Sequence, residues 1–272
     1  MEIRNVLILA RKELRDALKN RWFLLYTVCF AGLTLLLAKV SMNSAQGAGS
    51  FGRTTAGMVN LILLFVPLMG LTTAAASIAG ERERGTLVGL LAQPVHRIEI
   101  LLGKFLGLWI GLTLILALGL GVTAVMTTRG TAALWPLLRL LAFTDLLAGG
   151  MLSVGLLISA VSRRASVATG TAIFVWLTLV FLTDLGLMGS VLLFRLRVES
   201  LFYLTVANPM QSFKMAVLGS IHTSLDVLGP AGLFATQTYG SSLPWFFAMT
   251  LGAWIVVPLL AAWGVFSWRG EA

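Results

Sequence analysis

Long apolar runs recur along the chain and are separated by short polar segments. Six of these runs have the length of about 20 residues that a helix needs to cross a bilayer. They cover Trp22 to Val40, Thr54 to Gly80, Ile100 to Met126, Pro136 to Ser162, Ala165 to Val191 and Pro244 to Trp268. The pattern predicts an all-α membrane protein with six transmembrane helices that form a single domain over residues 1–272.

A different periodicity precedes the first span. Apolar residues recur at steps of three and four, with charged residues on the other face: Ile3, Val6, Leu7, Ala10, Leu14, Ala17 and Leu18. This spacing predicts an amphipathic interfacial helix over residues 1–21. Its basic face suits the anionic lipid of a cytoplasmic leaflet, and a helix packed on protein is the alternative.

Two of the polar segments that connect predicted spans are longer than the others. Residues 81–99 predict a short helix between two spans, which Pro94 ends before the chain re-enters the membrane. Residues 192–243 are too polar for two further spans and predict short outer helices between spans five and six. One of them should begin with Asn208 as N-cap and Pro209 as first residue.

That outer helix is expected to end at Gly219 and to lie flat at the membrane surface. Phe213 and Val217 should share one of its faces, because they are four residues apart.

Composition excludes an ordinary soluble domain. Hydrophobic residues make up 58% of the chain and charged residues 11%, against about 25% charged residues in soluble domains. The net charge of +9 comes from basic residues at the ends of apolar runs, and they form no stripe among aromatics, so nucleic acid is not an expected partner. The expected environment is membrane lipid.

The distribution of basic residues predicts the orientation. The side that holds both termini carries 13 Lys and Arg residues. The short loops on the opposite side carry four: Lys39, Arg53, Arg129 and Arg139. The positive-inside rule therefore predicts a multi-pass chain with both termini cytoplasmic. The expected location is the cytoplasmic (inner) membrane.

Catalytic patterns are missing from the sequence. It has neither an H-E-x-x-H motif nor a G-x-x-x-x-G-K-[ST] phosphate loop, and His96 and His222 are expected on opposite sides of the membrane. The chain is therefore not expected to be an enzyme, and any ATP and Mg would be bound by a partner. Met210 and Met215 could serve as soft copper ligands with His222, but core packing is the favoured role, so no metal site is predicted.

Two carboxylates lie within predicted spans. Asp145 and Asp184 are candidates for cargo passage or for a conformational latch, with Arg139 as one possible partner. A hydrogen bond between helices is the alternative role. Gly103, Gly107 and Gly111 recur every four residues, which permits close approach of another helix.

The segment from Gly80 to Lys104 carries the most informative motif. It reads E-x-x-x-G-T-L-x-x-L-L-x-x-P followed by L-G-K. The physical properties of this segment fit a helix that lies on lipid headgroups as well as they fit a helix that binds a partner protein. The motif resembles the coupling-helix region of type-2 ABC transporter permeases, in which this loop seats in a groove of a separate ATPase. The resemblance implies coupling roles for Glu81, Glu83, Gly85, Thr86, Leu87, Leu90, Leu91, Pro94 and Arg97.

Three other stretches are similar to permeases grouped with multicopper-enzyme maturation, including the subunit that serves the copper site of nitrous oxide reductase. They are Ile8 to Trp22, Thr183 to Leu185 and Ala207 to Pro209. This resemblance implies a partner ABC ATPase, a second permease copy in a homodimer, and a sulfur species or copper-related cargo. It also implies a periplasmic accessory protein that contacts Asn208, Pro209, Phe213 and Lys214.

Other functions remain compatible with the same residues. A generic type-2 export permease for drugs, lipids or peptides would share the spans and the motif. A membrane scaffold that only recruits an ATPase would keep the loop but tolerate loss of Asp145 and Asp184. A secondary transporter would need paired broken helices and buried ion ligands in matching halves, and the only hints of these are Pro67, Asp145 and Asp184.

Overall fold

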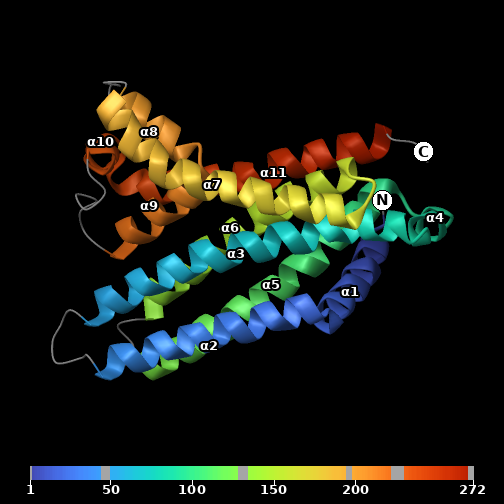
Figure 1. Ribbon diagram of the computed structural model, residues 1–272, viewed down its shortest axis with the longest axis horizontal. Helices are drawn as coiled ribbons and strands as arrows, with labels where there is room; N and C mark the ends of the chain where they lie inside the picture. Colours follow the sequence, from blue (N-terminus) through green and yellow to red (C-terminus); the bar gives the residue numbers. More distant parts are fainter. Residues whose placement is uncertain (1, 44–49, 128–133, 194–197, 222–229, 269–272) are drawn as a thin grey trace.

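The computed structural model describes residues 2–43, 50–127, 134–193, 198–221 and 230–268, and every element in these ranges is helical. The helices are drawn in Figure 1. Their bounds are α1 Ile3–Lys19, α2 Arg21–Asn43, α3 Ser50–Glu83, α4 Thr86–Leu91, α5 Arg97–Thr127, α6 Leu134–Val161, α7 Ala165–Leu193, α8 Val198–Val206, α9 Pro209–Ile221, α10 Pro230–Tyr239, the 3-10 turn η3 Gly240–Ser242 and α11 Leu243–Trp268.

Five helices in the described ranges are long and apolar enough to cross a membrane. Their spans are Arg21–Val40, Ala56–Glu83, Arg97–Thr123, Trp135–Val161 and Leu243–Trp268. They correspond to five of the six predicted spans. The remaining one, Ala165 to Val191, falls on α7, whose described apolar part is the shorter stretch Ala165–Phe181. The sixth span stays a prediction.

The long helices lie side by side along the longest axis of the molecule, as Figure 1 shows. The N-terminal part of α1, α4, the α6–α7 turn and the end of α11 lie together at one end, which we call the α4 end. Helices α8, α9 and α10 lie at the opposite end, the α9 end. The α4 end therefore gathers the segments that carry most of the basic residues.

The pair α3 and α6 forms the centre of the core. A Cβ at Gly155 would lie 2.7 Å from the Leu71 carbonyl oxygen and 2.7 Å from the Ala74 Cβ. Gly70 faces Met151 in the same way, at 3.0 Å from its Cβ. Because Gly70 and Gly155 lack a Cβ, the backbones of α3 and α6 can approach closely and pack densely.

Helix α1 packs on α5 and is separated from α2 by a break at Asn20. The Asn20 backbone is extended, and its side-chain oxygen accepts the Trp22 N–H at 3.0 Å, which caps the start of α2. The buried face of α1 includes Val6, Ala10 and Ala17.

An apolar strip of α1 remains uncovered beside that face. Ile3, Leu7 and Leu18 are exposed although they are apolar. The predicted amphipathic helix is therefore present, with one face packed on protein and an apolar strip exposed beside it. Contact of this strip with lipid stays a prediction.

The glycine stripe on α5 sets the distance to α1. A Cβ at Gly103 would lie 2.5 Å from the Leu9 Cβ, and a Cβ at Gly107 would lie 2.5 Å from the Ala10 carbonyl oxygen. The predicted close approach is confirmed, and the approaching helix is the chain's own α1.

Helix α9 begins as predicted but continues further. Pro209 is its first residue, and the Asn208 side-chain oxygen accepts the Met210 N–H at 3.0 Å. The predicted stop at Gly219 is wrong, because the helix runs to Ile221. The Ser220 hydroxyl donates to the Val217 carbonyl at 2.7 Å within this last turn.

Helix α9 is enclosed by other helices, and its orientation to the membrane surface stays a prediction. From Pro209 to Val217 every residue except the half-buried Lys214 is buried, and Phe213 and Val217 share a fully buried face. The helix packs against α6 and α11 and contacts α3 and α7. Its residues are buried on all sides of the helix. The spacing of apolar residues alone did not distinguish such an enclosed helix from a surface helix.

Candidate functional site

The connection between α3 and α5 is a short exposed helix at the α4 end. Helix α3 extends to Glu83, and Gly85 then adopts the left-handed conformation (φ 72°) that reverses the chain into α4. Helix α5 begins at Arg97. The short helix predicted within residues 81–99 is present, but it is limited to Thr86–Leu91, with Glu81 at the end of α3.

One side of α4 faces the chain itself. Leu87 is 6% exposed and belongs to the core, while Leu90 and Leu91 are half-buried. Val88 is 59% exposed on the other side. Leu87 thus anchors α4 to its own chain, and Val88 is an exposed apolar side chain on the other side. Contact of Leu90 and Leu91 with a partner stays a prediction.

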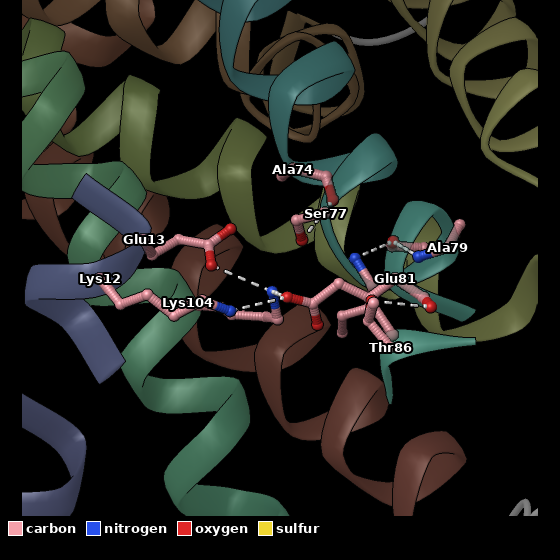
Figure 2. Close-up of polar contacts among 10 residues, drawn as sticks. Lys12, Glu13, Ala74, Ser77, Ala79, Glu81, Thr86 and Lys104 are labelled. Atoms are coloured by element: carbon pink, nitrogen blue, oxygen red, sulfur yellow. Dashed lines mark hydrogen bonds and ion pairs between the residues drawn. The ribbon is translucent and has the colours of Figure 1, made fainter. Parts of the chain in front are cut away.

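A buried ion network lies beneath α4 and joins three helices. The Lys104 Nζ lies 3.0 Å from Glu13 Oε2 and 3.0 Å from Glu81 Oε1, and Lys104 is 3% exposed. The Lys12 Nζ lies 3.3 Å from the same Glu81 oxygen. Figure 2 shows Lys104 of α5 between Glu13 of α1 and Glu81 of α3. Because an unpaired buried charge is costly, this network holds the three helices together.

Glu13 and Lys104 are not among the functional residues predicted from the sequence. Glu13 occurs at the spacing of the buried residues of α1, three after Ala10 and four before Ala17. A carboxylate in the middle of an apolar face requires a buried cation opposite it. That spacing could have predicted the network, with Lys104 of the L-G-K motif as the cation.

Other charged residues of the connection bind the ends of neighbouring helices. Arg82 donates to the carbonyls of Ala160, at 3.4 Å, and Ser162 at the end of α6. Glu83 accepts the Ala165 N–H at 3.0 Å at the start of α7. These contacts supply hydrogen-bond partners to backbone carbonyl and N–H groups that have no partner within their own helix.

Arg97 and Glu99 extend the same arrangement. Arg97 donates to the carbonyls of Phe266 at 3.1 Å and Ser267 at 3.0 Å, at the end of α11. Glu99 accepts the Glu2 N–H at 2.7 Å, at the start of α1. Charged residues on either side of α4 therefore bind the ends of α1, α6, α7 and α11.

The intramembrane Asp145 joins α6 to α5. Its carboxylate accepts the indole N–H of Trp109 at 3.1 Å and the hydroxyl of Thr113. Arg139 is exposed on α6. The structure thus contains the helix-to-helix hydrogen bond that was the alternative role for Asp145. Asp184 lies on α7, where its side chain is outside the described residues, so its role in passage stays a prediction.

Substitution of Asp145 distinguishes these roles. Asp145→Asn should keep both acceptor contacts and leave stability nearly unchanged. Asp145→Leu removes both and should lower the unfolding free energy by about 1–3 kcal/mol, from about 0.6–1.7 kcal/mol per interhelical hydrogen bond. Thermal unfolding in one detergent checks both variants. A large loss with Asp145→Asn would show that the negative charge itself is required.

The residues predicted to contact an outer partner are mostly enclosed at the α9 end. Asn208 donates to the Leu179 carbonyl at 2.9 Å, Phe213 is fully buried and Lys214 is half-buried. The partner contact stays a prediction. Met210 and Met215 are buried in the core, and the described ranges contain no group of three or more His, Cys, Asp or Glu side chains able to hold a metal.

Similarity to known proteins extends over nearly the whole chain. Residues 7–270 match the model of a family described as ABC-2 family transporter protein. A probable ABC transporter permease protein NosY of Stutzerimonas stutzeri is 32% identical over 271 residues, covering 96% of this chain and 97% of the relative. A protein of the same name from Pseudomonas aeruginosa is 31% identical over 274 residues, with the same two coverages.

Proposed function

The chain belongs to the ABC-2 transporter family, and from that premise we propose that a separate ATPase drives this permease subunit through α4. An ABC transporter permease implies such an ATPase partner, on which ATP and Mg are bound. The observation that carries the proposal is the construction of the α4 end. A short exposed helix connects α3 and α5, and charged side chains of α3 and α5 on either side of it bind the ends of several other helices.

In the proposed mechanism, force passes from α4 through the hydrogen bonds and ion pairs of the neighbouring charged residues. The ATPase presses on the exposed side of α4 around Val88. The force passes through Arg82 and Glu83 to the α6–α7 turn, and through the ion network of Glu81 and Lys104 to α1 and α5. Because packed helices move as stiff bodies, a small displacement at the α4 end is transmitted to the α9 end.

We further propose that the transporter serves maturation of a copper enzyme of the nitrous oxide reductase type. The two relatives named NosY and the similar stretches in the sequence support this assignment. The cargo would be a sulfur species or a copper-related species, received by a periplasmic accessory protein. Two copies would form a homodimer in the inner membrane, with the basic α4 end and both termini in the cytoplasm.

An acidic substitution on α4 tests the coupling surface. Val88→Asp should abolish co-purification of the ATPase, because a charge would then occupy an apolar contact with the partner. Val88→Thr is the control, since it keeps the shape without a charge, and it should retain the complex. Leu87→Asp is unsuitable because Leu87 is buried within the chain. A complex that survives Val88→Asp intact would exclude this surface.

The cargo assignment has a separate readout. In cells that lack this chain, a co-expressed nitrous oxide reductase should contain less copper by metal analysis, and the wild-type chain should restore it while Val88→Asp should not. A fully loaded reductase in the deletion strain would instead favour a generic export permease.

A further inference from the structure

The exposed side of α1 carries two neighbouring rows of side chains. One is the apolar strip of Ile3, Leu7 and Leu18. The other, which we call the arginine row, consists of three exposed residues: Arg4, Arg11 and Arg15. Arg11 follows Leu7 by four residues and Arg15 precedes Leu18 by three, so the two rows adjoin on the helix surface. The arginine row extends over about 16 Å of the helix.

No carboxylate in the described part of the chain forms an ion pair with the arginine row. The neighbouring charges Lys12 and Glu13 belong to the ion network beneath α4. Asp16 is exposed, but it lies about 100° around the helix from Arg15, where it borders a cleft between α1 and α3. The row is therefore a positive surface whose countercharge must come from outside the described chain.

The apolar strip leads directly to a membrane span. At Asn20 the chain passes from α1 into α2, and Figure 1 shows the change of direction between the two helices. Trp22, Leu25 and Val28 are exposed at the start of α2, and a tryptophan at the end of a span is typical of a membrane interface. An amphipathic helix in this place lies along the bilayer, with its apolar strip towards the acyl chains and its basic residues at the headgroups.

We propose that the arginine row binds anionic phospholipid headgroups of the bilayer that α2 crosses. The guanidinium groups donate to phosphate oxygens while the apolar strip enters the acyl region. Lipids with a net negative charge are preferred, because phosphatidylcholine carries a cation beside its phosphate.

Two other occupants fit this surface less well. The ATPase is a soluble partner and would have to cover an apolar strip that adjoins a membrane span. A second copy of the chain packed face to face would place a like-charged row against this one, which is unfavourable.

This inference goes beyond the proposed function, because lipid binding requires neither the ATPase nor the cargo. The full-length chain is reconstituted without nucleotide in bilayers of equimolar phosphatidylglycerol and phosphatidylcholine, and the lipids that it retains are counted by native mass spectrometry. The wild type should retain phosphatidylglycerol in excess. The double variant Arg11→Gln, Arg15→Gln should lower the ratio of the two retained lipids about 30-fold, since each basic residue at an anionic surface contributes about fivefold.

The double variant Arg163→Gln, Arg164→Gln is the matched control. These arginines are also exposed at the α4 end, but they lie in the α6–α7 turn. Their replacement removes the same charge and should leave the lipid ratio of the wild type. An equal loss in both variants would overturn the proposal, because lipid retention would then follow net charge. An unchanged ratio in the α1 variant would also overturn it, and loss of the ATPase from that variant would then assign the surface to the ATPase.

Discussion

Replacing Lys104 with Met is expected to lower the unfolding free energy by about 3–5 kcal/mol. Lys104 is the cation between Glu13 and Glu81, and its ammonium group is almost completely buried. The substitution leaves two carboxylates close together below the protein surface without their common partner. The penalty arises from these uncompensated charges and not from lost packing, since Met has nearly the same length as Lys.

Lys12→Met is the matched control for this prediction. Lys12 binds the same Glu81 oxygen, but its side chain is 47% exposed, so its removal should cost less than about 1 kcal/mol. The neutral triple variant Glu13→Gln, Glu81→Gln, Lys104→Met should recover most of the loss. Chemical unfolding of the three proteins in one detergent checks the order. Equal losses for Lys104→Met and Lys12→Met would show that the buried network is not a principal source of stability.

Adding a single methyl group at Gly107 is expected to detach α1 from α5. In Gly107→Ala the new Cβ would lie 2.5 Å from the Ala10 carbonyl oxygen and 2.8 Å from the Glu13 Cβ. The backbone oxygen cannot rotate away as a side chain could, so α1 must shift as a whole. Overpacking of this kind costs about 1–3 kcal/mol, and here it also moves Glu13 away from Lys104.

Gly121→Ala tests whether the effect belongs to the α1 contact. Gly121 also lies on α5, and a Cβ added there would meet no atom of another described helix within 4 Å. Because alanine favours helix over glycine, this variant should be neutral or more stable by up to about 1 kcal/mol. Trypsin should cleave Gly107→Ala faster than Gly121→Ala at the basic residues of α1. Equal cleavage rates would mean that α1 accommodates the methyl group in place.

Features that depend on a single segment could be predicted from the sequence. Hydrophobicity over about 20 residues identified the five helices that are long enough to span a membrane. Apolar spacing identified α1, and the Asn-Pro pair identified the start of α9. Each of these patterns acts through hydrogen bonds or solvent transfer within one stretch of chain, so no knowledge of neighbouring helices is needed.

The candidate site depended more strongly on tertiary packing. The motif located α4, but the direction of its leucines followed from how α4 folds back on the core. Arg82, Glu83 and Arg97 are charged residues near the membrane by sequence, and only the fold brings them to the ends of α6, α7 and α11. The paired residues are 78 or more positions apart in the sequence, and a hydrogen bond forms only at short range, so the fold decides which residues pair.

The sequence by itself therefore determined that this is a helical membrane chain with an amphipathic first helix and a glycine stripe that allows close approach. Only the tertiary structure decided that α1 is the helix that fills the stripe, that Lys104 joins it to α3, and that α9 is enclosed. The physical reason is that hydropathy and backbone preference are properties of one segment. The pairing of a buried charge or a missing Cβ is a property of two segments brought together.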